Sequence, residues 1–417
     1  MNYLYNVFTV MVLIFSQTTV LSQGNMAKNN AIINLTIHST VLQRDQHIQV
    51  YLPEDYSTTS RSYPVLYILD GQHYFYYGVA FQQTSKWRYR SPEFIVAGIT
   101  TKNKQLRRLD FGSELRFLKY RDFLEKELLP HIEKNYRVSD DRMIFGWQSP
   151  GYCVIQVLLE RPELFSAYFV ASAASVDSIK FEQFARRSLN SEKFLYFARS
   201  PDETWLTKVF TKSTALLQKK APKNLRWKSE LFVEEDHWST PYRTIYRGLT
   251  EYYYDYQPLL FESLQDYENA GGIQHLINHY QRRGEKYNVS HEIHPSTIFN
   301  LLSLSMRADN YESFDFFMTY FTGEIPGLYP VRWHHRYGQF YLKHEKLQKA
   351  QSFFKEALQA MPNSPLLYAG LGDVYQKLGE KQQAEEAYQK AIDLAQKIED
   401  PGLENYKDKL IKLKTNE

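Results

Sequence analysis

Between about residues 30 and 255, apolar runs of strand length alternate with segments of helical periodicity. Near-continuous apolar runs, typical of strands buried on both faces, occupy residues 63–69, 93–99, 142–146 and 194–198. A run at 228–233 alternates polar with apolar side chains, and residues 32–52 do so more regularly before Pro53, as in an antiparallel edge hairpin. Residues 117–136 have apolar side chains at helical spacing. Because buried strands that alternate with helices form βαβ units, this pattern predicts an α/β fold with a doubly wound, mostly parallel sheet.

Beyond Asp255 the strand-like runs stop and an internal repeat begins. Small and aromatic residues recur 34 positions apart in the pairs Gly338/Gly372, Tyr341/Tyr375, Ala350/Ala384, Phe354/Tyr388 and Ala357/Ala391. This period resembles that of the tetratricopeptide repeat, a helix–turn–helix unit whose copies bury each other's apolar faces. A degenerate copy with Phe314, Phe317 and Pro326 supplies the third repeat that stability requires. We therefore expect a helical linker at 256–295 and an all-α tetratricopeptide-repeat domain with a Lys-rich C-terminal cap at 296–417.

The N-terminus has the layout of a secretory signal peptide. A nine-residue, mostly apolar run from Val7 to Phe15 is followed by polar residues and by the small residue Ser22. The run is too short to span a bilayer, and an uncleaved apolar N-terminus is the alternative. The pattern predicts a signal peptide at 1–22, an exported protein, periplasmic or secreted, and a first domain at 23–255.

Composition narrows the classes of function. The 417 residues include 50 Lys and Arg against 47 Asp and Glu, so the formal charge of +3 gives no reason to expect a nucleic-acid partner. The single cysteine, Cys153, excludes an intramolecular disulfide and a cysteine-based metal cluster. His275 and His279 are four residues apart but lack a third ligand, and no phosphate-binding glycine loop is present. We expect no metal and no cofactor.

The residues that follow the predicted strands carry the candidate chemistry. The third buried strand ends in Gly146-Trp147-Gln148-Ser149-Pro150-Gly151 before an apolar helix. A strand, a sharp turn with Ser and Gly, and a helix resemble the nucleophile elbow of α/β-hydrolases. Asp202 and Glu203 follow the next strand, and His237 follows the last one. Nucleophile, acid and histidine occur in this chain order in that fold.

Several stretches together resemble the putative esterase family, which includes enterochelin esterases and esterase D-like enzymes with an α/β-hydrolase fold. The similar stretches are residues 50–53, 63–71, 127–132, the elbow at 146–151 and Glu235-Asp236-His237. Members of this family also carry C-terminal tetratricopeptide repeats. The resemblance implies a carboxylic-ester hydrolase with His237 as base, Glu203 or Asp202 as the residue that orients it, and the backbone N–H groups of Gly71 and Gln72 as oxyanion donors.

The elbow departs from the family pattern G-H-S-x-G-G. With both flanks in register, Gln148 stands at the position of the serine, and a carboxamide is not a nucleophile for acyl transfer. A shift by one residue makes Ser149 the nucleophile. Trp147 then stands where the turn needs a small residue, and Pro150 provides no N–H to the oxyanion hole.

Two functions remain open. The first is an exported serine esterase that uses Ser149 on a carboxylic ester. The second is a catalytically silent hydrolase fold that binds a small ester or acyl ligand or serves as a scaffold, while its repeats dock a protein partner. Neither involves nucleic acid or a stable membrane span. Whether Ser149 or Gln148 lies within reach of His237 distinguishes the two. Arg107, Arg108 and Asp110 are expected in a solvated loop.

Overall fold

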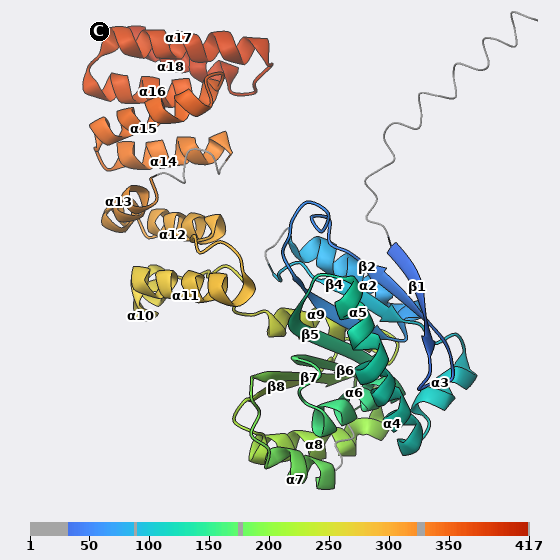
Figure 1. Cartoon of the computed structure of the whole chain (residues 1–417). Coiled ribbons are helices and arrows are strands. Elements are labelled where there is room, and N and C mark those ends of the chain that lie inside the picture. The colour runs from blue at the N-terminus through green and yellow to red at the C-terminus, as the bar shows by residue number, and fades with distance from the viewer. Residues whose placement is uncertain (1–31, 87–89, 174–177, 323–329, 416–417) are drawn as a thin grey trace, which may run out of the picture. The chain divides into compact units, whose positions relative to one another are not determined.

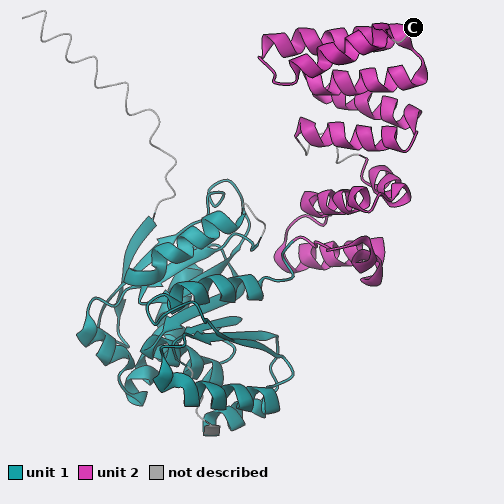
Figure 2. Ribbon diagram, turned by 180° about the vertical axis from the view of Figure 1, so that it is seen from behind, with its two compact units in different colours: residues 1–257 teal, residues 258–417 magenta. Residues whose placement is uncertain are grey.

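The computed structural model describes residues 32–86, 90–173, 178–322 and 330–415. The signal segment expected at 1–22 lies outside these residues. The chain divides into two compact units, Met1–Gln257 and Pro258–Glu417, which are described separately below (Figure 2).

The first unit is built on one eight-stranded sheet with the order β1-β2-β4-β3-β5-β6-β7-β8 (Figure 1). Its strands are β1 (Ile32–Ser39), β2 (Arg44–Tyr51), β3 (Tyr63–Leu69), β4 (Ile95–Ile99), β5 (Val138–Trp147), β6 (Ala167–Ala171), β7 (Lys193–Arg199) and β8 (Leu225–Leu231). The hairpin of β1 and β2 is antiparallel and pairs with β4, and every later pair in the sheet is parallel. The predicted α/β fold with a doubly wound, mostly parallel sheet is confirmed.

Burial explains which strands the hydrophobic pattern detects. All residues of β4, β6 and β7 are buried, whereas β1 and β2 alternate buried with more exposed positions. Strand β6 was not predicted from the sequence, although it is as long and as fully buried as β4. The helix expected at 117–136 is a continuous helical segment that consists of α4 (Glu114–Phe123), a π-helical turn (Leu124–Leu128) and α5 (Leu129–Asn135).

Helices cover both faces of the sheet. One face is covered by α2 (Gly71–Ser85) and α9 (Thr240–Tyr252), which contact each other. The core on the other face includes side chains of α4, the π-helical turn and α5, together with those of three later helices. These are α6 (Ser149–Glu160), α7 (Ser178–Ala185) and α8 (Thr207–Lys220). A short helix, α3 (Lys104–Phe111), follows β4 and contacts α6.

The second unit consists of helices. They are α10 (Leu264–Asn269), α11 (Gly272–Tyr287), α12 (Pro295–Arg307), α13 (Tyr311–Tyr320), α14 (Val331–Lys343), α15 (Leu347–Ala360), α16 (Pro365–Leu378), α17 (Lys381–Lys397) and α18 (Leu403–Thr415). Tyr267, Leu276 and Tyr280 share one buried core with Ile298 and Leu301. The segment expected as a linker, 256–295, therefore contributes α10 and α11 to the core of this unit.

The 34-residue spacing has a packing cause. A Cβ atom on Gly372 would lie 2.5 Å from the ring of Tyr388, and one on Gly338 would clash with Phe354. Each glycine therefore lets an aromatic ring of the next helix approach its backbone, and the contact recurs in both repeats. In the degenerate copy, Phe314 and Phe317 are buried.

Candidate active site

Four strands of the parallel sheet lead into one group of polar side chains. Asp70 follows β3, Gln148 follows β5, Glu203 lies beyond β7, and His237 lies beyond β8. These are all carboxyl ends of strands, and in a sheet of this topology ligands bind at that edge.

The turn between β5 and α6 has Gln148 at its apex. Its φ of 58° and ψ of −123° are strained for a residue with a side chain. A Cβ on Gly146 would lie 2.6 Å from the backbone carbon of Pro150, and one on Gly151 would lie 2.9 Å from the carbonyl oxygen of Gly146. The two glycines therefore allow strand and helix to approach closely, which is the geometry of a nucleophile elbow. The elbow presents the side chain of Gln148.

His237 contacts the apex residue on one side and a buried carboxylate on the other. Its Nε2 lies 2.5 Å from Nε2 of Gln148, and its Nδ1 lies 2.5 Å from Oε1 of Glu203. Glu203 is 0% exposed, and its second oxygen accepts a hydrogen bond from the backbone N–H of Ser200 at 2.8 Å. The carboxylate is thus held through both oxygens, so it fixes the orientation of the imidazole ring.

Arg107 determines which way the amide of Gln148 points. Its Nη1 donates to Oε1 of Gln148 at 3.1 Å, and its Nη2 donates to the carbonyl oxygen of Trp147 at 3.1 Å. A guanidinium group only donates, so the amide oxygen must face Arg107 and the amide N–H must face His237. Nε2 of His237 accepts this hydrogen bond, and the ring proton therefore sits on Nδ1 and is donated to Glu203.

Asp70 anchors this arginine. Its carboxylate is 2% exposed, and one oxygen accepts from Nε of Arg107 at 2.8 Å. Asp70 has a left-handed backbone, with φ 54°, between β3 and α2. Among the described residues, its other oxygen has no hydrogen-bond partner.

Arg107, Arg108 and Asp110 lie in helix α3, so the expected loop was wrong. Arg108 is exposed as expected, whereas Arg107 is at the site and Asp110 is buried against Arg44 at 2.7 Å. Helix α3 follows β4 and thus starts at the same edge of the sheet as the elbow. Asp70 was the sequence feature that could have predicted a cation such as Arg107 at the site. A carboxylate directly after a buried strand is itself expected to be buried, and a buried carboxylate needs a positive partner.

The remaining predicted residues lie around this cluster. Ser149 is the first residue of α6 and is exposed, and its hydroxyl makes no hydrogen bond to the described side chains. Asp202 accepts from the backbone N–H of His237 at 3.2 Å and does not contact the imidazole; a hydrogen bond from Ser200 lowers the pKa of its carboxyl. Gly71 packs against β4, and the side chain of Gln72 accepts from the N–H of Thr101. The role of their backbone N–H groups as oxyanion donors stays a prediction.

Tryptophan rings surround His237. The ring centroids of Trp147, Trp205 and Trp238 lie 5.0, 5.6 and 5.3 Å from that of the imidazole. Trp147 is buried, and its indole N–H donates to Oγ of Ser172 at 3.1 Å. Trp205 and Trp238 are 63% and 70% exposed. Exposed aromatic side chains grouped beside polar atoms are typical of a binding surface.

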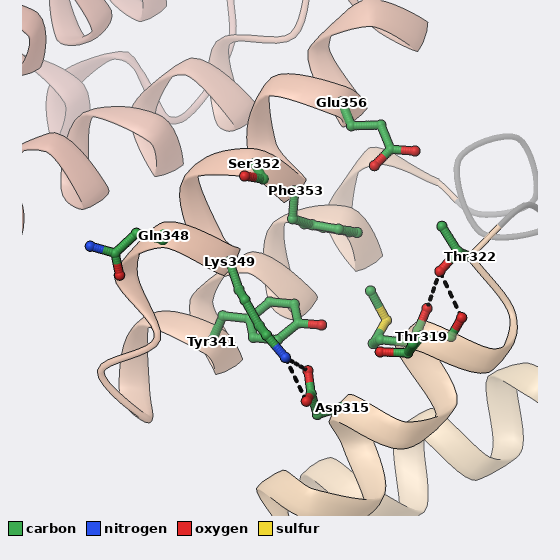
Figure 3. A pocket seen from close by; sticks show the side chains of 10 residues that line it. Asp315, Thr319, Thr322, Tyr341, Gln348, Lys349, Ser352, Phe353 and Glu356 are labelled. Atoms are coloured by element: carbon green, nitrogen blue, oxygen red, sulfur yellow. Dashed lines mark hydrogen bonds and ion pairs between the residues drawn. The ribbon is translucent and has the colours of Figure 1, made fainter.

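The helical unit contains a separate cavity of about 310 Å³, shown in Figure 3. Its lining residues are Asp315, Met318, Thr319, Thr322, Tyr341, Gln348, Lys349, Ser352, Phe353 and Glu356. Lys349 forms an ion pair with Asp315 at 2.5 Å in its wall. The described residues include no group of three or more His, Cys, Asp or Glu side chains arranged to hold a metal ion. No helix in the described part combines the length and apolarity needed to cross a membrane.

Comparison with known proteins identifies both parts of the chain. A family model described as "Putative esterase" matches residues 39–247, and one described as "Tetratricopeptide repeat" matches residues 330–397. The chain is 41% identical over 51 residues to ferri-bacillibactin esterase BesA of Bacillus subtilis (strain 168). These aligned residues make up 12% of this chain and 18% of BesA. It is 25% identical over 136 residues to the uncharacterized protein YbbA of the same organism, and the aligned residues make up 29% of this chain and 54% of YbbA. The chain thus spans about half or less of these two relatives.

Two crystal structures share the fold. An IroE-like serine hydrolase from Shewanella oneidensis is 20% identical with a TM-score of 0.51, over 69% of this chain and 98% of that one. An uncharacterised protein from Capnocytophaga ochracea DSM 7271 is 16% identical with a TM-score of 0.53, over 93% of this chain and all of that one. With the esterase model matching half of its residues, the chain belongs to the putative esterase family of α/β-hydrolases and carries tetratricopeptide repeats at its C-terminal end.

Proposed function

We propose that this protein binds an acyl ligand at the carboxyl edge of its sheet without forming a covalent acyl-enzyme. The observation that carries the proposal is the carboxamide of Gln148 at the apex of the elbow, in contact with His237. A carboxamide has no hydroxyl to ionise, and its nitrogen lone pair is delocalised into the carbonyl. It cannot act as the nucleophile of acyl transfer.

The alternative, an exported esterase that uses Ser149, has less support. Ser149 lies one residue past the apex, in the first turn of α6. Both ring nitrogens of His237 are occupied, by Gln148 and Glu203, so the imidazole has no free lone pair with which to activate this hydroxyl. Pro150, which follows, has no backbone N–H for an oxyanion hole.

Ligand binding is supported by a backbone donor and by exposed aromatic surface at the site. The N–H of Ser149 lies in the first turn of α6, where backbone N–H groups have no partner within the helix and can donate to a carbonyl oxygen. The exposed rings of Trp205 and Trp238 offer apolar surface next to His237. Together these groups can hold an acyl group by hydrogen bonds and stacking.

The rest of the chain supports a scaffold role outside the cytoplasm. We propose that the concave surface of residues about 296–397 docks a protein partner, because stacked helix pairs form extended grooves. We also propose export through the signal segment 1–22, which rests on its apolar run and on the small residue at 22.

A fluorophosphonate probe, which reacts with activated serine hydroxyls, tests the proposal together with hydrolysis of an activated ester. We expect the native protein and Ser149→Ala to be equally unreactive. Gln148→Ser, with the base and acid already in place, should gain labelling and hydrolysis. Labelling of the native protein that Ser149→Ala abolishes would establish the esterase instead.

A further inference from the structure

The amide of Gln148 sits between a donor and an acceptor. Its oxygen lies 3.1 Å from Nη1 of Arg107, and its nitrogen lies 2.5 Å from Nε2 of His237. The carboxamide of Gln148 is therefore held with a defined polarity, its carbonyl oxygen toward a donor and its N–H toward an acceptor.

We propose that this pair of residues is a recognition site for a carboxamide, and that Gln148 is its resident occupant. The inference rests on the proposed function, since it names the chemical class of ligand that binds non-covalently at that site. The ligand's carbonyl oxygen accepts from Arg107, and its N–H donates to Nε2 of His237. No bond is made or broken.

The hydrogen-bonding polarity of the site is fixed by the residues that hold Arg107 and His237 in place. Arg107 is anchored by Asp70 and by the carbonyl oxygen of Trp147, so its Nη1 stays directed at the occupant. Glu203 is buried and accepts the Nδ1 proton, so Nε2 presents a lone pair. Ketones and simple esters carry acceptors only and leave that lone pair without a donor. A site built to hydrogen-bond one group discriminates strongly against an analogue that lacks it.

The resident side chain also limits which ligands enter. Gln148 is tethered to the site, and a group held by a short tether competes at an effective concentration of about the millimolar range or above. A free ligand must therefore make further contacts to displace it. The exposed rings of Trp205 and Trp238 lie beside the same imidazole and provide surface for such contacts.

Gln148→Gly allows a direct test. It removes the side chain, and glycine tolerates the φ of 58° at this position. Propionamide has the same heavy atoms as the deleted side chain, and 2-butanone replaces its NH₂ group with a methyl group of similar size. We expect the variant to bind propionamide at least about tenfold more tightly than 2-butanone in calorimetric titrations. The native protein should bind propionamide much more weakly than the variant, because Gln148 fills the site.

A matched pair of arginine variants locates the recognition. In the Gln148→Gly background, Arg107→Met should weaken the binding of both probes, because each presents a carbonyl oxygen to this residue, whereas Arg108→Met, at an exposed position on the same helix, should leave both affinities unchanged. Equal affinity for the two probes, or no binding of propionamide to a variant that circular dichroism shows to be folded, would overturn the inference. Gln148→Ala, which keeps Cβ and is therefore titrated with acetamide and acetone, serves as the second variant if the glycine variant does not fold.

The two proposals fail separately. Serine-dependent labelling of the native protein would overturn the proposed function and leave the propionamide preference intact. Equal affinity for propionamide and 2-butanone would overturn the recognition site, while the native protein remained unlabelled.

Discussion

The side-chain nitrogen of Gln148 lies 2.5 Å from Nε2 of His237, the atom that takes the proton of the serine nucleophile in an active hydrolase. The contact is made from the apex of a strained elbow, and Glu203 holds the other side of the imidazole. The machinery that would activate a serine is therefore assembled around a side chain that has no hydroxyl.

The first prediction concerns the minimal change that restores chemistry. Gln148→Ser alone should suffice, because the residue after the apex is Ser149, which keeps its backbone N–H. Pro150→Gly should add little, since Pro150 lies one residue beyond this donor. Initial rates on an activated ester for the single and double variants measure this. A double variant at least about a hundredfold faster than the single one would mean that the oxyanion donor lies at position 150.

The second prediction separates the two acidic candidates. In the Gln148→Ser background, Glu203→Gln should lower kcat by about 10²–10⁴, because the amide no longer holds the imidazole in the required tautomer. Asp202→Asn should change kcat only a few-fold, since Asp202 accepts from the backbone N–H of His237 and does not touch the ring. The reverse order of effects would assign the orienting role to Asp202.

The third prediction concerns packing in the repeats. Gly372→Leu should destabilise the second unit by about 2 kcal/mol or more, because its side chain would enter the space taken by Tyr388. Lys377→Leu, at an exposed position of the same helix α16, should change stability by less than about 0.5 kcal/mol. Urea unfolding followed by far-UV circular dichroism compares the two. Equal midpoints would contradict the close approach of α16 and α17.

The fourth prediction is a pH dependence of stability that arises from His294. Burial, with a contribution from the positive charge of Arg283, lowers the pKa of His294 to about 4 from its ordinary value of 6.5. Between pH 6.5 and 4 the unfolded chain binds a proton that the folded chain does not, so stability falls as the pH falls through this window. The loss should be about 1–3 kcal/mol.

His294→Asn provides the control for this effect. His294 caps α12 by accepting from the N–H of Ser296 at 3.0 Å, and Asn is a good N-cap that does not titrate. The unfolding free energies of the native protein and the variant should run parallel above about pH 6.5, and the native protein should lose stability relative to the variant as the pH falls toward 4. Parallel curves across the window would show that His294 does not contribute.

The fifth prediction concerns export. Protein purified from its native host should begin near Gln23, because cleavage is expected after Ser22. N-terminal sequencing or intact mass measures this. A retained N-terminal Met1 would refute the signal peptide.

The class of fold and the repeats could be predicted from the sequence alone. Strands such as β3 and β7 are buried along most or all of their length, so they leave apolar runs that can be read directly. The repeat was visible because Gly338 and Gly372 serve the same packing need at a fixed spacing. Both signals can be read along the sequence without knowing which segments meet in space, and so can the chain order of elbow, acid and histidine.

The assembly of the site could not be predicted from the sequence, because it depends on contacts between distant segments. The register of the elbow left Gln148 and Ser149 as alternatives, because one residue of shift changes no local pattern, while the apex dihedral angles distinguish them. Arg107 reached the site because α3 begins at the edge where β3 and β5 also end, a proximity that sequence spacing does not encode. Residues 256–295 were predicted to be a linker, because their apolar side chains form a core only with helices that come later in the chain. All three features depend on contacts between segments that are far apart in the sequence. Such contacts exist only in the folded chain.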